Sequence, residues 1–501
     1  MDRKPQIGSP PHPTAVIPVV STMPADLLTP LAVYLKLAGN GRDSFLLESV
    51  EGGESLARYS FIGVDPEFTI TGNSRTTHIF RGDLETEADV PVIEYLRDHF
   101  AKFRMEVGDG LPGFAGGAIG ILDFSAAAWF EPSLRPMVPE SPVEGAFMFC
   151  RSVVAFDHAS QLIKIITLVF AEEADGGMEV LKTEARARNE RIARVLEFDP
   201  LVLPEPPQPP VSDPVTVSNF SKADFEAAVR DVKENIAAGD AYQVVISQCF
   251  TRETAASAIA IYRAVRSLNP SPYMFLVRMN GREIIGASPE MLVRCRDGQL
   301  EYRPIAGTRK RGRDGAEDER LAEELKADKK EVAEHLMLVD LGRNDLGRVA
   351  EFGSVKVDGL MNVEKYSHVQ HLVSYLYARL RPGLDRFDAL AACFPAGTVS
   401  GAPKMRAIEI ISRLEPTPRG MYAGSVGYFD YSGNMDTCIA IRTMELKDGI
   451  ARIQAGAGIV ADSDPSAEYD ETVKKATALM RAIDIAEGRA NSATGEIVEK
   501  S

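Results

Sequence analysis

The chain has 501 residues, of which 45% are hydrophobic and 26% are charged. These values are typical of a globular enzyme with room for about two or three domains, or for one large interleaved body. The formal net charge of −16 argues against a nucleic-acid binder, because phosphate backbones require a basic surface. Any anionic substrate must therefore be held by a local cluster of donors and not by the overall field.

Cysteine usage and hydropathy predict a cytoplasmic protein. The five cysteines are scattered and lack a Cys-x-x-Cys spacing, which indicates neither a disulfide framework nor a zinc site. Residues 1–14 are polar and rich in proline, and they lack the apolar segment of a signal peptide. No apolar run approaches the ~18–20 residues that a membrane-spanning helix needs.

A proline-rich segment at 200–214 predicts an extended linker between an N-terminal region, residues 20–200, and a C-terminal region, residues 215–487. In the first region, alternating apolar residues predict strands at 45–49, 59–63 and 161–170. A helix is expected at 179–195. The glycine-rich segment 113–120 is expected to bring backbones close together.

The C-terminal region begins with a predicted helix that Ser221 can cap and Gly239 can end. Further helices are expected at 317–341, interrupted or ended by Gly342, at 404–414 with Pro403 in the first turn, and at 465–485. Strands are expected at 242–250, 273–277, 283–286, 291–295, 425–430, 437–444 and 453–457. Groups of neighbouring antiparallel strands with helices between them predict an α+β fold.

Two Glu-x-x-Glu pairs carry the first chemical signal. Glu331 and Glu334 lie in one predicted helix, and Glu468 and Glu471 lie in another. Residues three apart share a helix face, so each pair presents two carboxylates on one side. If the pairs converge, they form an all-oxygen site that suits a hard cation such as Mg²⁺. Each pair alone is more typical of a solvated helix face.

Three single residues are further candidates, each with a structural alternative. Arg442 lies among apolar neighbours in a predicted strand, where it would bind either a substrate carboxylate or an acidic side chain of the protein. His371 lies in an apolar strand, as core histidines also do. Glu290 follows a strand at a turn, where a partly buried carboxyl can act as a general acid or simply face solvent.

Four longer segments resemble the signature blocks of the chorismate-utilising enzymes, most of all component I of anthranilate synthase. They are RPIAGTR at 303–309, EHLMLVDLGRND at 334–345, GTVSGAPK at 397–404, and the stretch from QAGAGIV at 454–460 through Glu471. The resemblance covers residues 20–485. It implies a sandwich of two antiparallel β-sheets with helices outside, and chorismate bound in the cleft between the sheets.

The resemblance also implies roles for individual residues. Glu334 and Glu471 would hold Mg²⁺ against the ring carboxylate, with Glu331 and Glu468 beside them through water. The enolpyruvyl carboxylate would be held by Arg442, Tyr422 and the backbone of Gly456, Ala457 and Gly458. Gly307 and Thr308 would line the ring pocket. Glu290 would protonate the departing C4 hydroxyl, and His371, with Thr398 beside it, would assist pyruvate loss and aromatisation.

Two positions separate this chain from sibling enzymes of the family. Isochorismate and salicylate synthases carry a water-activating lysine where this chain has Gln243, and aminodeoxychorismate synthases carry a lysine where it has Ala306. Both positions favour ammonia as the nucleophile, and hence a lyase that makes anthranilate and pyruvate from chorismate in L-tryptophan biosynthesis. The alternatives are an aminodeoxyisochorismate, aminodeoxychorismate or isochorismate synthase. A non-enzymatic chorismate or tryptophan sensor is disfavoured because every candidate catalytic position is intact.

Partners follow from the same resemblance. The chain shows no glutamine-cleaving module, so a separate glutamine amidotransferase subunit is expected to supply ammonia. The segments 46–49 and 269–275 resemble the two halves of the family's L-tryptophan feedback site, which implies inhibitor contacts from Glu48, Ser49, Pro272, Tyr273 and Met274. The alternative is a strand and a proline turn that merely pack together.

Overall fold

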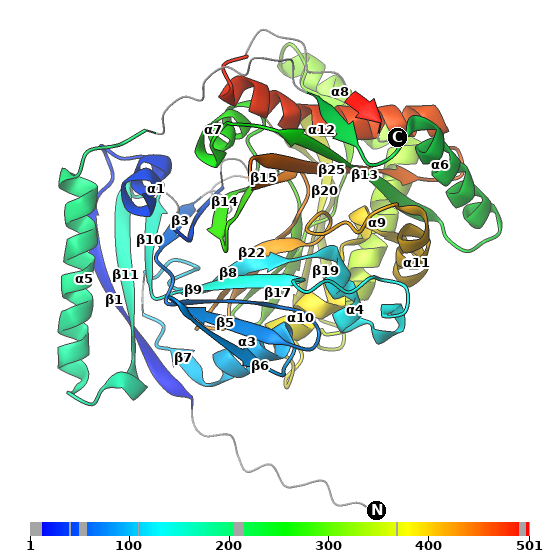
Figure 1. Ribbon diagram of the computed structural model, residues 1–501. Coiled ribbons are helices and arrows are strands. Elements are labelled where there is room, and N and C mark those ends of the chain that lie inside the picture. Colours follow the sequence, from blue (N-terminus) through cyan, green and yellow to red (C-terminus); the bar gives the residue numbers. More distant parts are fainter. Residues whose placement is uncertain are drawn as a thin grey trace, which may run out of the picture.

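The computed structural model describes residues 13–39, 42–49, 58–108, 110–203, 215–366, 369–489 and 497–499. Two large sheets face each other across one hydrophobic core, and helices cover their outer faces (Figure 1). The predicted α+β sandwich is therefore confirmed. Among the described residues, no helix is long and apolar enough to cross a membrane.

The first sheet has 14 strands. Its path from edge to edge is β26 (Ile497–Glu499), β12 (Thr216–Ser218), β13 (Gln243–Glu253), β25 (Ile450–Ile459), β24 (Thr443–Lys447), β15 (Arg282–Ser288), β14 (Tyr273–Met279), β2 (Ser44–Glu48), β3 (Tyr59–Val64), β10 (Ser152–Asp157), β11 (Leu162–Phe170), β1 (Thr14–Pro24) and β7 (Phe103–Met105), with β21 (Gly401–Ala402) paired to β13.

The second sheet has 12 strands. Its path is β18 (Ile305–Lys310), β20 (Val369–Arg379), β17 (Gln299–Tyr302), β16 (Met291–Arg296), β23 (Met435–Ile439), β22 (Ser425–Asp430), β8 (Gly117–Leu122), β9 (Gly145–Cys150), β4 (Phe68–Gly72), β5 (Thr77–Arg81) and β6 (Leu84–Ala88), with β19 (Lys356–Lys365) paired to β20. Apart from the parallel pairs β1–β7 and β12–β26, the described strand pairs are antiparallel.

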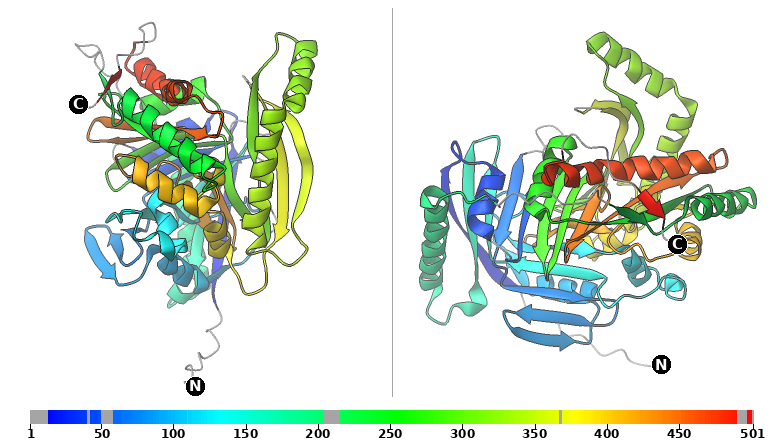
Figure 2. Two further views of the ribbon diagram at one scale, coloured as in Figure 1. Left: turned by 90° about the vertical axis from the view of Figure 1, so that its right-hand side faces the viewer. Right: turned by 45° about the horizontal axis from the view of Figure 1, so that its top comes forward.

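Helices flank the sheets on their outer sides (Figures 1 and 2). The α-helices are α1 (Pro30–Ala38), α3 (Val92–Ala101), α4 (Ala127–Phe130), α5 (Met178–Phe198), α6 (Lys222–Ala237), α7 (Ala258–Leu268), α8 (Gly315–Ala327), α9 (Lys329–Gly347), α10 (Arg386–Cys393), α11 (Lys404–Leu414) and α12 (Pro465–Ala486). Helix α5 lies along β1 and β11, α12 packs on α7 and β25, and α9 packs on β18 and β20.

Strands from both sides of the proline-rich segment share each sheet. In the first sheet β14 pairs with β2, and in the second β22 pairs with β8. The regions 20–200 and 215–487 are therefore joined by continuous sheets and by one core between them. Most of the predicted linker, residues 204–214, lies outside the described residues.

Glycines let the second sheet close tightly. A Cβ atom built on Gly117 would lie 2.1 Å from the carbonyl oxygen of Phe429, and one on Gly120 would lie 2.1 Å from that of Ala146. Neither position can hold a side chain without moving backbone. The close approach predicted for the segment 113–120 is thus confirmed, and it brings β8 against β22 and β9.

Three local predictions were wrong. The helix predicted at 317–341 is two helices, because the Asp328 carboxylate accepts hydrogen bonds from the amides of Lys330 and Glu331 and begins α9. Gly342 does not end α9; it lies inside the helix, where a Cβ atom would lie 2.6 Å from the Tyr302 ring. Pro403 is the N-cap of α11 and not a residue of its first turn.

The strand predicted at 437–444 is also wrong, with a consequence for the site. It consists of β23 in the second sheet and β24 in the first, so the chain crosses between the sheets at residues 440–442. Arg442 adopts a positive φ of 51° at this crossing, a conformation that is uncommon for a residue with a side chain. The crossing places Arg442 between the sheets and not within a strand.

Candidate active site

A cleft of about 660 Å³ lies between the two sheets and is bordered by α9 and α12. Most of the predicted catalytic, substrate and metal residues line it. They are Glu290, Thr308, Glu331, Glu334, His371, Thr398, Tyr422, Arg442, Gly456, Gly458, Glu468 and Glu471. Gly307 and Ala457 are not among the lining residues, although each is adjacent in sequence to residues that are.

The four glutamates reach the cleft because two helices begin beside it. Asp328 caps α9 and Asp464 caps α12, each accepting hydrogen bonds from amides of the first turn. Glu331 and Glu468 therefore lie in the first turns, and the second glutamate of each pair lies three residues further along the same helix face. Two pairs from segments more than 130 residues apart thus face one cavity.

Positive side chains compensate only part of this negative charge. Arg309 lies 3.3 Å from Glu331, and Lys475 lies 2.6 Å from Glu471. Burial, followed by repulsion from Glu331, raises the pKa of Glu334.

The donor set suits a hard cation, because every candidate ligand is a carboxylate oxygen. The carboxylates do not, however, converge on one point: within the described ranges, no three acidic, histidine or cysteine side chains are grouped so that they could hold a metal. Two of the carboxylates form ion pairs within the protein instead, Glu331 with Arg309 and Glu471 with Lys475. A cation would have to draw these carboxylates together.

Arg442 faces the cleft without an acidic partner. Within the described chain it forms no ion pair, and its backbone carbonyl accepts a hydrogen bond from Ala287. Burial lowers the pKa of Arg442, with partial opposition from nearby Tyr422, Glu290 and Glu471. A half-buried guanidinium without a fixed counter-charge is suited to bind the carboxylate of a ligand.

The glycines of β25 let the side chains of Tyr422 and Gln243 approach the strand where it borders the cleft. A Cβ atom on Gly456 would lie 2.7 Å from the Tyr422 hydroxyl, and one on Gly458 would lie 2.4 Å from Nε2 of Gln243. Strand β24 pairs with β25 only as far as Ile453, and no other described strand pairs with this edge of β25 beyond that residue. Backbone N–H groups on an unpaired strand edge can bind an anion.

Glu290 lies between β15 and β16, at the predicted turn. Oγ1 of Thr398 donates a hydrogen bond of 2.9 Å to its Oε2 atom. Burial raises the pKa of Glu290, while the Thr398 hydrogen bond and the charges of Lys475 and Arg442 oppose the shift. A raised pKa keeps a carboxyl protonated to higher pH, which suits a general acid. Thr398 was expected beside His371; its side chain instead hydrogen-bonds to Glu290.

His371 is held by the strand that pairs with its own. Its Nδ1 atom lies 2.9 Å from the carbonyl oxygen of Gly307 and 3.2 Å from Oγ1 of Thr308. A carbonyl can only accept, so Nδ1 carries the proton and Nε2 is left as an acceptor. Burial lowers the pKa of His371, which keeps the ring neutral. Gly307, at φ +68° in a bulge of β18, presents this carbonyl.

The sequence interpretation missed two lysines of the cleft, Lys330 and Lys475. Lys475 donates a hydrogen bond of 2.9 Å to the carbonyl oxygen of Gly456 and pairs with Glu471. Its position four residues after Glu471 on the same helix was the available signal. Gln243 and Ala306, the positions that separate sibling enzymes, both line the cleft.

A second, smaller pocket of about 100 Å³ lies beside the cleft. All five residues of the predicted feedback site line it: Glu48, Ser49, Pro272, Tyr273 and Met274. The two halves meet because β2 and β14 are neighbouring antiparallel strands, with Glu48 opposite Met274. Pro272 lines both this pocket and the cleft.

Comparisons with known proteins identify the family of this chain. Residues 42–481 match the family of chorismate binding enzymes. The chain is 44% identical to anthranilate synthase component 1 of Aquifex aeolicus, covering 94% of this chain and 95% of the relative, and 42% identical to that of Bacillus subtilis, covering 94% and 93%.

Solved structures give the same result for the fold. The crystal structure of anthranilate synthase component I from Streptococcus pneumoniae aligns with TM-score 0.73 and 34% identity, over 91% of this chain and 98% of that one. The menaquinone-specific isochorismate synthase of Escherichia coli aligns with TM-score 0.69 at 22% identity, over 94% and 95%, and so shares the fold.

Proposed function

Because this chain belongs to the family of chorismate binding enzymes, among relatives that are component 1 of anthranilate synthase, we propose that it converts chorismate and ammonia to anthranilate, pyruvate and water. It is a chorismate-utilising enzyme of tryptophan biosynthesis.

One observation carries the proposal: the cleft holds unpaired positive charge at one point and excess negative charge at another. Arg442 has no acidic partner in the described chain, whereas two glutamate pairs face the cleft from α9 and α12. A substrate with two carboxylates meets this pattern if one binds Arg442 directly and the other is bridged to the glutamates by a cation. Two fixed points leave the ring between them little freedom to rotate.

The acid and the base of the reaction follow from their environments. Glu290, whose pKa is raised by burial, donates the proton that lets the C4 hydroxyl leave as water when ammonia adds at C2. His371, neutral and with Nε2 unprotonated, assists the later loss of the enolpyruvyl group as pyruvate, which makes the ring aromatic. Gln243 and Ala306 supply neither a water-activating base nor a competing amine.

Mg²⁺ is the proposed metal, held by Glu334 and Glu471 with Glu331 and Glu468 in support. When bound, it would neutralise and hold a substrate carboxylate. Burial raises the pKa of Glu334, and repulsion from Glu331 and Glu471 adds to the shift; a cation would relieve that repulsion, which supports this assignment. Lys475, now 2.6 Å from Glu471, would then keep its other contact, the carbonyl oxygen of Gly456.

A glutamine amidotransferase subunit is the proposed source of ammonia, and L-tryptophan the proposed inhibitor. A pocket of 100 Å³ is smaller than the roughly 300–1,000 Å³ of common ligand sites, so the walls of the pocket would have to move apart for tryptophan to bind. Movement of Pro272 would change the shape of the cleft directly, because this residue borders both the pocket and the cleft. That shared wall supports feedback by an altered cleft.

The test is to supply the purified chain with chorismate, Mg²⁺ and ammonium at alkaline pH and to identify the products by mass and by anthranilate fluorescence. Anthranilate and pyruvate that form only with metal and ammonium are the expected result. Glu334→Gln should lose this activity while the melting temperature stays within a few degrees of wild type. Full turnover in that variant would contradict the metal site.

Other products would point to sibling reactions. An amino product that keeps its enolpyruvyl group would identify an enzyme that stops before elimination. Isochorismate or salicylate would contradict the role given to Gln243. Absence of any turnover, with chorismate still bound, would favour a sensor.

A further inference from the structure

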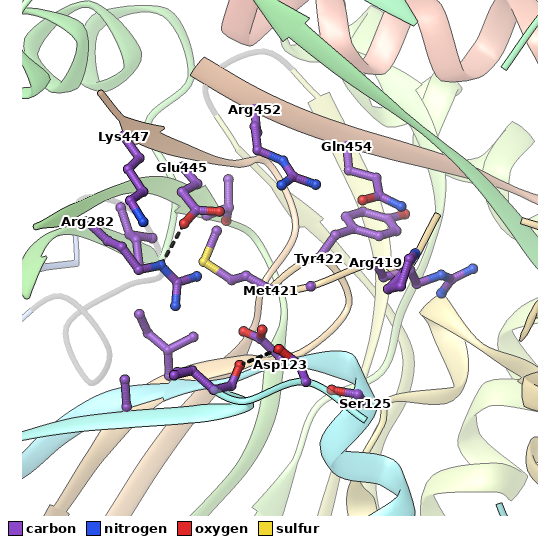
Figure 3. Close-up of a pocket in the computed structure, with 18 of the residues that line it drawn as sticks. Asp123, Ser125, Arg282, Arg419, Met421, Tyr422, Glu445, Lys447, Arg452 and Gln454 are labelled. Atoms are coloured by element: carbon purple, nitrogen blue, oxygen red, sulfur yellow. Dashed lines mark hydrogen bonds and ion pairs between the residues drawn. The ribbon is translucent and has the colours of Figure 1, made fainter. Parts of the chain in front are cut away.

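Two tyrosines line the catalytic cleft, and their hydroxyl groups are held differently. Tyr422 lies at the border between the cleft and a separate cavity of about 980 Å³ (Figure 3). Its hydroxyl forms no hydrogen bond within the described chain, so it remains available to a ligand. Tyr366 also lines the cleft, but its hydroxyl donates to Oε2 of Glu364 at 2.9 Å and accepts from the guanidinium of Arg303 at 2.9 Å. Tyr366 is therefore held by the protein itself.

Glu364 lies directly beside His371 in the second sheet. Strand β19 pairs with β20 so that Glu364 is opposite His371, and β18 places Thr308 opposite His371 on the other side. Directly opposed residues of antiparallel strands have neighbouring side chains on one face of the sheet. Glu364 does not line the cleft, so it has no direct part in the proposed chemistry. Its register nevertheless makes it the cross-strand neighbour of the proposed catalytic histidine.

A buried arginine fixes the position of Glu364. Arg303 is 4% exposed, and its guanidinium pairs with Oε2 of the Glu364 carboxylate. The Tyr375 hydroxyl, four residues after His371 on β20, donates to the other oxygen, Oε1. These residues form the Glu364 cluster, which consists of Arg303, Glu364, Tyr366 and Tyr375. Breaking a buried ion pair leaves an uncompensated charge, so the Glu364 cluster is expected to be rigid.

Tyr366 connects the Glu364 cluster to His371. The ring centroids of Tyr366 and His371 lie 5.5 Å apart, and the rings are inclined at 64° in an edge-to-face contact. The hydrogen bond between Nδ1 of His371 and the Gly307 carbonyl restricts one atom of the imidazole ring. A second contact is needed to fix the direction in which the other nitrogen, Nε2, points. The ring of Tyr366 supplies this contact.

The Glu364 cluster acts on His371 by position more than by charge. Burial lowers the pKa of His371, and within the cluster the charge of Glu364 raises it whereas the charge of Arg303 lowers it. The two charges therefore act in opposite directions, as expected for a close ion pair. Because they offset each other, the main contribution of the cluster is the fixed ring that it places against the imidazole.

We infer that Glu364 and Tyr366 position His371 for the loss of pyruvate, the second step of the reaction. The inference rests on the proposed function, in which ammonia addition depends on Glu290 and pyruvate loss on His371. In the second step the ring carbon that carries the amino group gives its proton to Nε2 of His371, and the bond from the neighbouring carbon to the enolpyruvyl oxygen breaks. The departing enolpyruvate takes up a proton and becomes pyruvate. A displaced His371 slows this step and leaves ammonia addition unchanged.

Single-turnover kinetics separate the two steps. Enzyme in excess over chorismate is mixed with Mg²⁺ and ammonium and quenched at increasing times, and chorismate, the amino intermediate and anthranilate are quantified by mass. Tyr366→Phe keeps the ring but removes the hydroxyl that holds it in place. Tyr377→Phe is the matched control, because Tyr377 lies on β20 outside the cleft and its hydroxyl forms no hydrogen bond within the described chain.

We expect Tyr366→Phe to slow the decay of the amino intermediate about tenfold to 100-fold, while chorismate disappears at the wild-type rate. Glu364→Gln should slow the same step and also lower the melting temperature, because Arg303 is left buried without a counter-charge. If Glu364→Gln does not fold, Tyr366→Phe alone decides. The control should match the wild type in both steps.

Two results would overturn the inference: a wild-type decay rate in folded Tyr366→Phe, or equal slowing of both steps, which a general structural role would produce. A wild-type protein that forms no anthranilate would instead overturn the proposed function, so the two failures are distinct.

Discussion

The catalytic cleft and the smaller pocket beside it differ in how their charged groups are paired. In the cleft, Arg442 has no acidic partner in the described chain, and Glu334 has a raised pKa beside other carboxylates. In the pocket, the Tyr273 hydroxyl donates to Asp436 at 3.1 Å and Arg294 pairs with the same carboxylate at 2.8 Å.

The cleft is therefore a site that is formed before its ligand binds, whereas the pocket stays closed until a ligand opens it. Uncompensated charge in a half-buried site is unfavourable, and it is retained where a ligand supplies the missing partner. Paired groups stabilise the closed pocket, so a ligand there must replace contacts that already exist. The cleft is therefore expected to bind with local movement of its charged side chains only, and the pocket to shift the protein between two states.

The largest effect is expected at the acid of the cleft. Glu290→Gln keeps the shape and can still accept the hydrogen bond from Thr398, but an amide cannot donate the proton that the leaving hydroxyl needs. We expect kcat to fall about 10³-fold, with the KM for chorismate little changed. Steady-state kinetics with ammonium would measure both. An unchanged kcat would remove Glu290 from the chemistry and leave the cleft as a binding site.

Arg442→Ala tests the same comparison, because it should lower the activity without lowering the stability of the fold. Loss of the carboxylate contact should lower kcat/KM for chorismate about 10²-fold, and Arg442→Lys should recover part of it. The melting temperature should not fall, since no acidic group loses a partner. Arg419→Ala is the contrasting control: it breaks a buried pair with Glu415 and should destabilise the fold by about 3–5 kcal/mol. Equal destabilisation by both would mean that Arg442 is structural.

The pH dependence of the reaction tests the neutral state of His371. Burial lowers its pKa below the ordinary value of 6.5, so the unprotonated Nε2 is present above the lowered pKa and is lost as pH falls through it. We expect kcat to decline by up to about tenfold per pH unit on this acidic limb. A pH series on wild type and His371→Asn would measure it. The limb should be absent in the variant, whose residual activity is low; a limb that persists belongs to another group.

The sequence predicted the residues of the cleft better than the chain path that brings them together. The glutamate pairs were predictable because helix periodicity alone sets which side chains share a face. Arg442 was assigned to a continuous strand because its neighbours are apolar, yet residues 437–444 form strands in two different sheets. Local hydropathy does not distinguish one buried strand from two that meet at a crossing.

Tertiary contacts explain the other errors. Gly342 lies within α9 because Tyr302 fills the space where a Cβ atom would lie, a contact that no local pattern reveals. Asp328 divides one predicted helix in two because its side chain competes for amides of the next turn.

The smallest effect is expected in the closed pocket, where one polar atom breaks the general pattern. Oγ of Ser49 is buried and has no hydrogen-bond partner among the described residues. An unsatisfied hydroxyl costs about 1–3 kcal/mol, so Ser49→Ala should stabilise the free protein slightly while removing a group available to tryptophan. We expect the inhibition constant for L-tryptophan to rise about fivefold to tenfold and kcat to stay unchanged.

Ser60→Ala is the matched control, because Ser60 is buried on neighbouring β3 and its Oγ bonds Nε2 of His158 at 2.8 Å. It should lower the melting temperature and leave inhibition unchanged. Thermal unfolding and inhibition of ammonium-dependent turnover would measure both variants. If Ser49→Ala lowers the melting temperature and leaves inhibition intact, Ser49 is part of the packing between β2 and β14, and tryptophan acts elsewhere. Ser49→Ala is thus expected to raise stability and to weaken inhibition, because Oγ of Ser49 is unpaired in the free protein. A purely structural role of Ser49 would not produce this combination.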